Sequence, residues 1–233
     1  MATLTQGRPV GNGGAVIVST GGRMAGDASI GRPLPGRLDP IRLPSPPLSD
    51  GIIALRAWAA TDVPAVVAAC QDSEIPRWTL VPRPYTPEDA RLWLATHAAG
   101  LRSGRRAEFA IVAAGDHADV LGSIALVRHP TIDDRAEVGY WIAAPARGRG
   151  VATRAVRLTA AWGFGALGVR RIELLAEPGN VGSQRVAERA GFRRERMLKR
   201  HRRQKGTWRD FHLFALTAGE DPAIHPPFRP GSD

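Results

Sequence analysis

The stretch PARGRGVATRAV, residues Pro145 to Val156, is the most unusual part of this sequence and the most informative about its fold. Gly148 and Gly150 alternate with Arg147 and Arg149 at the start of a segment that otherwise predicts a helix. Glycine in a helix interior costs roughly 1 kcal/mol relative to alanine, so this pair of glycines needs a reason. Glycine also permits unusual backbone torsions and lets a ligand approach the backbone closely.

This helix entrance suits a bound pyrophosphate. The first N–H groups of a helix lack intrahelical partners, and the helix dipole places positive charge there. A Walker A loop would need a Gly-Lys-Ser/Thr ending, and a dinucleotide fingerprint would need glycine or alanine where Thr153 stands, so neither pattern is present. The alternative, that the glycines only shape a strand-to-helix turn, stays open from the local pattern.

Charge is unevenly distributed over the 233 residues, whose formal net charge is +10. Residues 189–209 hold ten arginines and lysines and one acid, Glu195, which favours an anionic partner such as nucleic acid, although such runs are often only a solvated face. A single cysteine, Cys70, excludes an internal disulfide. Without a secretion signal, an apolar run of membrane-spanning length or a Cys/His cluster, we expect a cytoplasmic protein with no metal and no membrane contact.

Composition divides the chain into three parts. Residues 1–50 are rich in glycine and proline and lack aromatic residues, which predicts a disordered tail. Within it, residues 15–18 are a candidate strand and Met24 is an alternative start to Met1. Residues 51–218 have a globular pattern, and residues 219–233 form a C-terminal tail.

Alternation and capping patterns predict one α+β domain with a mixed, largely antiparallel sheet. Thr86 followed by Pro87 is the clearest helix start, and Thr61 is a second expected N-cap. Gly139 inside a strand predicts a bulge. Further helices are expected at 150–167 and 180–190, and strands at 52–58, 108–114, 120–129, 136–144, 170–177 and 210–216.

The hexapeptide Arg147 to Ala152 resembles the R/Q-x-x-G-x-G/A signature of the GNAT acetyltransferases. The longer span 137–195 resembles the RimJ/RimL-type ribosomal-protein branch, including N-x-x-S from Asn180 to Ser183 and the AGF that follows; a weaker likeness covers residues 52–216. The resemblance implies a three-layer fold with splayed central strands and direct acetyl transfer from acetyl-CoA to a primary amine. The acceptor would be a protein N-terminal α-amine or a small-molecule amine.

The resemblance also implies which residues contact the cofactor. The glycine loop would bind the pyrophosphate, and a backbone N–H of residues 138–142 would polarise the thioester oxygen. Asn180 would cap its helix and face the cofactor. The implied cofactor-binding residues are Val138, Tyr140, Ile142, Arg147, Gly148, Arg149, Gly150, Val151, Ala152 and Asn180.

For catalysis, Glu137 is the first choice of general base, directly or through water; the alternative is a strand carboxylate paired with an arginine. Ser183 resembles the family's proton donor or thiol contact; the alternative is a local hydrogen bond in the first helical turn. An α-amine has a pKa about 2.5 units below that of lysine, roughly 3.4 kcal/mol, so it needs less help from a base. Trp78 and Tyr85 are hypothetical acceptor contacts.

The sequence departs from the family pattern at residues 198–206, LKRHRRQKG. Some ribosomal-protein acetyltransferases carry a glutamate base after the GF strand, and no acid stands there in this chain. His201 is a candidate base, with a solvated histidine as the alternative, and the basic loop indicates an acidic or anionic acceptor. A competing hypothesis is a weakly active GNAT-fold module that binds ribosome or RNA through residues 189–209. A cationic drug is a poor candidate acceptor, because the acceptor side of this protein is expected to be basic. The sequence leaves open whether the protein is a monomer or a homodimer.

Overall fold

The computed structural model describes residues 38–129, 132 and 134–219. The predicted tail up to residue 37, with residues 15–18 and Met24, lies outside the described residues, as does the C-terminal tail from residue 220. The remaining part of the predicted N-terminal tail, residues 38–50, packs onto the domain. There Ile41 is buried in the main core and β1 (Leu48–Ser49) pairs with β2 (Ile53–Arg56).

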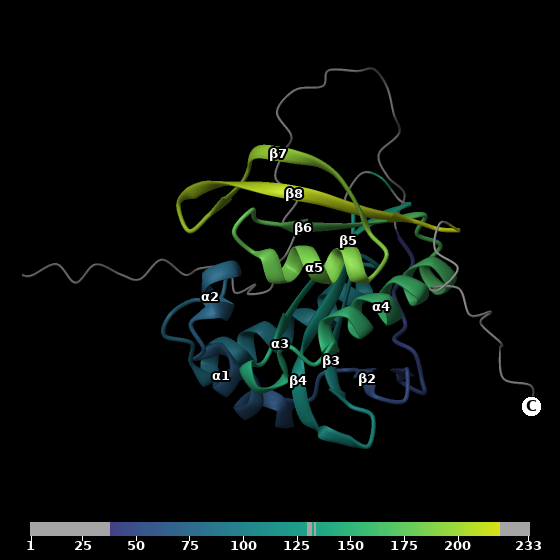
Figure 1. Cartoon of the computed structure of the whole chain (residues 1–233). Coiled ribbons are helices and arrows are strands. Elements are labelled where there is room, and N and C mark those ends of the chain that lie inside the picture. Colours follow the sequence, from purple (N-terminus) through teal and green to yellow (C-terminus); the bar gives the residue numbers. More distant parts are fainter. Residues whose placement is uncertain (1–37, 130–131, 133, 220–233) are drawn as a thin grey trace, which may run out of the picture.

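The described strands form one sheet in the order β1-β2-β3-β4-β5-β6-β8-β7 (Figure 1). All neighbours are antiparallel except β5 and β6, which are parallel. This arrangement confirms the predicted mixed, largely antiparallel α+β fold. The remaining strands are β3 (Arg106–Ala113), β4 (Asp116–Arg128), β5 (Arg135–Ile142), β6 (Arg171–Ala176), β7 (Arg193–Gln204) and β8 (Thr207–Thr217).

The parallel strands β5 and β6 separate after a short paired stretch. Their pairing runs from Arg135 opposite Arg171 to Glu137 opposite Glu173 and stops there. Beyond this point β5 remains paired with β4, and β6 remains paired with β8. The carboxyl ends of β5 and β6 therefore diverge and leave an opening in the middle of the sheet, as the resemblance implied.

Helices cover both faces of the sheet. On one face lie α1 (Val63–Cys70), α2 (Glu74–Trp78) and α3 (Pro87–Arg102), and on the other lie α4 (Val151–Leu167) and α5 (Val181–Arg189). Strand alternation sorts the side chains: Ile124 and Leu126 belong to the core under α4, whereas Ala125 packs with Trp93 of α3. Among the described residues no helix is long and apolar enough to cross a membrane.

Local sequence signals account for several boundaries. The Thr86 side chain accepts a hydrogen bond from the Asp89 backbone N–H, and the Asp89 carboxylate accepts from the Thr86 backbone, which completes the predicted start of α3. Asn180 caps α5 as predicted. Glycine 168, with φ of 65°, ends α4 in a left-handed conformation that favours glycine.

Three expectations are corrected. Thr61 does not cap α1: a 3-10 turn, Ala60–Asp62, precedes that helix, and Asp62 stands at its N-cap position because Arg56 binds the Asp62 carboxylate. Gly139 forms no bulge, since it pairs in regular register with Ala125. Residues 198–206 are not a loop, because most of them belong to β7 and its turn to β8.

Candidate functional site

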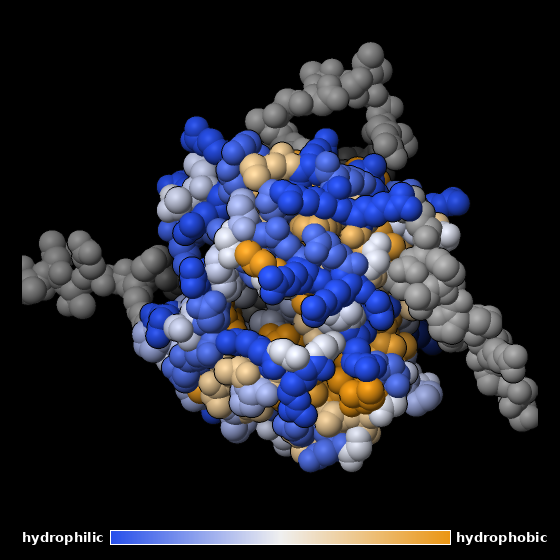
Figure 2. Space-filling view, in the orientation of Figure 1, coloured by the Kyte–Doolittle hydropathy of each residue, from blue (hydrophilic) through white to orange (hydrophobic). Residues whose placement is uncertain are grey.

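A cavity of about 570 Å³ lies where β5 and β6 separate. Figure 2 shows the corresponding hollow between α2, α5 and the start of α4, with apolar residues at its floor. One end is formed by the glycine loop, and the other by α2 and the first turn of α5. Its wall includes Ile75, Trp78, Tyr140, Ile142, Arg147, Gly148, Gly150, Val151, Ala152, Gly179, Asn180 and Ser183.

The glycine loop is open toward this cavity. Gly148 and Gly150 have φ values of 74° and 77°, and a Cβ atom at either position would meet nothing within 4 Å. Gly150 is also the N-cap of α4, and no side chain caps that helix. The N–H groups of Val151 and Ala152 thus lie at an uncapped helix start, an arrangement that fits a phosphate group.

Arg147 holds the loop in place. Its Nε donates to the Ile142 carbonyl at 3.0 Å, and its Nη2 donates to Asp72 Oδ1 at 2.9 Å. That hydrogen bond is the main reason why the pKa of Asp72 is lowered. Arg147 therefore ties the loop to the end of β5 and to the turn after α1, whereas Arg149 is exposed and does not line the cavity.

Two hydroxyl groups meet deep in the cavity. Tyr140 of β5 donates to Ser183 Oγ of α5 at 3.1 Å, across the separation of the strands. The Asn180 side chain accepts from the Ser183 backbone N–H at 3.1 Å, which orients this first turn. Burial raises the pKa of Tyr140, so its phenol stays protonated at neutral pH. Val138 is buried in the core beside them.

Glu137 is held by an arginine. Arg202 of β7 donates to both of its carboxylate oxygens, at 2.8 and 2.5 Å, and both side chains are largely buried. The structure thus shows the ion pair that the sequence left open as the alternative to a base. Because Arg202 lies 65 residues away, this pair also ties the β7–β8 hairpin to the centre of the sheet.

The sequence interpretation missed a second carboxylate, Glu177, which does not line the cavity itself but precedes Gly179 and Asn180, which do. Glu177 follows β6 and continues its alternation with Glu173 and Leu175, on the face opposite α4. Its side chain is 13% exposed, and its nearest cation is Arg209 at 3.8 Å. Burial raises the pKa of Glu177. The sequence feature that could have identified Glu177 as a candidate site residue is its position directly before the turn that leads to Asn180.

The remaining predicted side chains are scattered. Trp78 lines the cavity, donates through Nε1 to Glu74 at 3.0 Å, and packs near Gly179. Tyr85 is buried among α1 and α3 and does not line the cavity. Trp93 of α3 is a core residue. His201 stacks edge-on against Phe211, and burial lowers its pKa.

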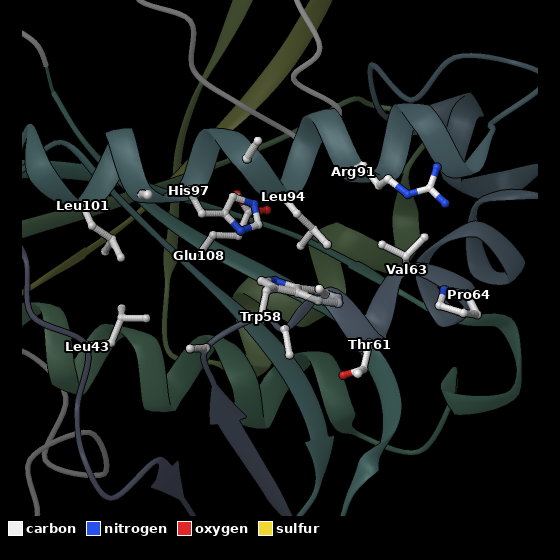
Figure 3. Close-up of a pocket in the computed structure, with 15 residues that line it drawn as sticks. Leu43, Trp58, Thr61, Val63, Pro64, Arg91, Leu94, His97, Leu101 and Glu108 are labelled. Atoms are coloured by element: carbon white, nitrogen blue, oxygen red, sulfur yellow. The ribbon is translucent and has the colours of Figure 1, made fainter.

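A second cavity of about 870 Å³ lies beside α1 and α3 (Figure 3). Trp58 extends across its middle, with His97 and Glu108 at one wall and Leu43 and Leu101 at one end. Burial lowers the pKa of His97 to about 4, so the imidazole is neutral at pH 7. None of the predicted site residues lines this cavity.

Comparisons with known proteins agree on the family. Residues 53–193 match the model of the acetyltransferase (GNAT) domain. The "Probable N-acetyltransferase YjcK" of Bacillus subtilis is 31% identical over 140 residues, which cover 59% of this chain and 76% of that protein.

One similar solved structure and one relative that aligns over fewer residues belong to the same class of enzyme. RimJ of Mycobacterium smegmatis, solved in complex with CoA-disulfide, superposes with a TM-score of 0.64 at 28% identity and covers 74% of this chain and 85% of that one. The "Putative ribosomal N-acetyltransferase YdaF" of Bacillus subtilis is 38% identical over 74 residues, which cover 32% of this chain and 40% of that protein. Since the domain model spans more than half of the sequence, the chain belongs to the GNAT family of N-acetyltransferases.

Proposed function

We propose that this protein transfers an acetyl group from acetyl-CoA to a primary amine, and that the acceptor is the α-amine of a protein N-terminus. The observation that supports it most is that an uncapped glycine-lined helix start and a buried pair of hydroxyl groups share one cavity. A CoA compound bound to the similar RimJ supports the cofactor. The ribosomal name of YdaF favours a protein acceptor.

Different parts of the cavity would bind different parts of acetyl-CoA. The backbone at Gly148, Gly150, Val151 and Ala152 would hold the pyrophosphate, with Arg147 fixing the loop rather than acting as a free cation. The β5 backbone between Val138 and Ile142 has lost β6 as a neighbour, so its free edge is available to a ligand. A backbone N–H there would stabilise charge that develops on the thioester oxygen.

Acetyl-CoA supplies an acyl carbon activated by a thiolate leaving group. The acceptor amine must first lose a proton, and the base candidates are Glu137 and Glu177. The contacts favour Glu177, because the Glu137 carboxylate is occupied by two hydrogen bonds from Arg202. Glu177 does not line the cavity itself, so it would take one proton from the ammonium group through water. The neutral nitrogen then attacks the acyl carbon, and the new C–N bond replaces the C–S bond. The proton on Glu177 then returns to solvent.

The leaving sulfur needs a proton as its bond to carbon breaks. Ser183 Oγ is the proposed donor, and Tyr140 restores its proton through their 3.1 Å hydrogen bond. The second proton leaves the attacking nitrogen at the same time and, through solvent, replaces the one that Tyr140 gave up, so the net products are the acetylated amine, a thiol and one proton. A backbone hydrogen bond to the Asn180 side chain keeps Ser183 in place.

Isothermal titration of acetyl-CoA into the wild type and Gly150→Glu tests this function. The glutamate adds bulk, negative charge and a strained positive φ at the phosphate site, so we expect Kd to rise at least about 100-fold, roughly 2.7 kcal/mol. Gly168→Glu is the matched control: it has φ of 65° and open space too, but lies at the other end of α4. Its acetyl-CoA affinity should stay near that of the wild type.

A screen for free-thiol release then identifies the acceptor. Peptides with a free N-terminal amine, matched peptides with a blocked N-terminus and an internal lysine, and small amines are compared. Turnover confined to the free α-amines supports the proposal. Wild type that binds no acetyl-CoA, or turnover confined to lysine side chains or small amines, contradicts it.

A further inference from the structure

We propose that the β7–β8 hairpin, residues 193–209, is a binding surface for single-stranded RNA. The inference goes beyond acetyl transfer and rests on the exposed cations of this hairpin and on the exposed aromatic side chain near its turn. Figure 2 shows a largely hydrophilic surface, interrupted by a small apolar patch, over the part of the molecule where Figure 1 places β7 and β8.

The cations of the hairpin are largely uncompensated. β7 carries seven arginines and lysines and a single acid, Glu195, which Arg171 of β6 binds at 2.8 and 2.7 Å. Five exposed arginines of β7 form no ion pair with a carboxylate among the described residues. They are Arg193, Arg194, Arg196, Arg200 and Arg203, of which Arg194 contacts His212 instead. Guanidinium groups bind phosphate in a bidentate manner, so this set suits a chain of phosphodiesters.

Protection of a sheet edge does not account for this composition. β7 is the last strand of the sheet, and charged side chains do discourage edge-to-edge pairing. At the opposite edge of the sheet, β1 has only two residues, so it is too short to pair with the edge of another sheet. Edge protection would also not place Trp208, 50% exposed, and Met197, 39% exposed, on the same hairpin.

The aromatic residue indicates the kind of polyanion. Trp208 lies directly opposite Arg203 in the register of the hairpin, so an exposed indole and a guanidinium without a carboxylate partner are cross-strand neighbours. The Nε of Arg203 donates to the Gly206 carbonyl. Unpaired bases stack on aromatic and guanidinium planes while cations contact the backbone. A duplex hides the faces of its bases, and unpaired loops and ends are common in RNA, which favours single-stranded RNA as the partner.

Two contacts anchor the hairpin, one to β5 and one to α2 at the end of the cavity away from the glycine loop. Arg202 binds Glu137 of β5, and Lys205 donates to the Pro76 carbonyl of α2. The exposed arginines are therefore presented by an anchored strand, so less conformational entropy is lost on binding than with a loose loop.

The test is fluorescence polarisation with a labelled single-stranded RNA of about 12 nucleotides, across a salt series. Four phosphate contacts predict that Kd rises about 50-fold between about 50 and about 200 mM salt. Trp208→Ala should weaken RNA binding about tenfold and leave heparin binding unchanged. The variant with Arg193, Arg196 and Arg203 changed to Gln should lose most of the affinity and of the salt dependence.

Its matched control changes Arg42, Arg91 and Arg102 to Gln, which removes the same charge from exposed positions outside the hairpin. Acetyl-CoA titration of every variant shows that the fold is intact. Equal losses in both triple variants, no effect of Trp208→Ala, or tighter binding of duplex DNA than of RNA would each overturn the proposal. No polarisation change at low salt would overturn it as well.

Discussion

The two ends of the central cavity are built in different ways. The end that we propose for the cofactor, called the cofactor end, is local: a glycine loop, an uncapped helix start and the Asn180 cap lie within about forty consecutive residues. The end that we propose for the acceptor, called the acceptor end, depends on distant contacts, since Glu137 binds Arg202 and Lys205 binds the Pro76 carbonyl. Local motifs are visible in a sequence, whereas long-range pairs depend on how strands are ordered in the sheet. We therefore expect the two ends to respond differently to substitution.

Arg202→Met should have the largest effect and should separate the two ends. It leaves the buried Glu137 carboxylate without its partner, so the free energy of unfolding should fall by about 3–5 kcal/mol. Combining it with Glu137→Leu should recover much of that loss, because the unpaired charge is removed. Urea unfolding measures both variants. A change of less than about 1 kcal/mol in Arg202→Met would show that this pair behaves as a surface ion pair.

Glu177→Gln should lower kcat/KM by about 100-fold, roughly 2.7 kcal/mol, with the amine selected by the thiol-release screen. Burial raises the pKa of Glu177, so in the wild type this carboxylate loses its proton and becomes a base only as pH rises through that raised value. The variant should lose this limb of the pH–rate profile. Glu173→Gln, which removes a carboxylate on the same face paired with Arg171, is the control and should leave the profile unchanged.

The free energy of unfolding of Glu177→Gln tests independently whether this carboxylate has a structural role. A carboxyl group with a raised folded-state pKa favours folding at low pH, and that contribution is lost as pH rises through the raised value. The neutral glutamine should therefore not destabilise the protein at pH 7, in contrast to Arg202→Met. A stability loss comparable to that of Arg202→Met would indicate that Glu177 is a structural ion-pair partner instead.

Tyr140→Phe should have the smallest effect and probes the cofactor end. Loss of the hydrogen bond to Ser183 should lower kcat by about five- to tenfold, in line with about 1 kcal/mol for one hydrogen bond. Ser183→Ala combined with Tyr140→Phe should be no slower than Ser183→Ala alone, because Tyr140 acts through Ser183. Additive losses in this cycle would show that the two hydroxyl groups act independently.

Much of the cofactor end was predictable because each signal is short in range. The Gly148–Gly150 pattern, the Asn180 cap and the Thr86 start of α3 each involve residues within a few positions of one another. The fold class followed from the alternation of strands and helices. Tyr140 was expected near the cofactor through its strand, but its bond to Ser183, 43 residues later, was not expected.

Other errors have a common cause. Residues 193–204 are almost uniformly polar, so no apolar alternation marks β7, and pairing with β8 makes them a strand. Tyr85 was a hypothetical acceptor contact, yet it is buried in a core cluster that includes Val66 of α1 and Trp141 of β5. In both cases the neighbours that decide the structure lie outside any local window.

The sequence by itself determined the glycine-lined helix start, the caps at Thr86 and Asn180, the mixed sheet and the family, because these depend on backbone torsions and on contacts between nearby residues. Only the tertiary structure decided which carboxylate is neutralised and which is left under-compensated. Glu137 and Glu177 are both acids of central strands in the sequence, but Arg202 binds one with two hydrogen bonds while Arg209 stays 3.8 Å from the other. The strand order places those arginines, and charge compensation acts through space rather than along the chain.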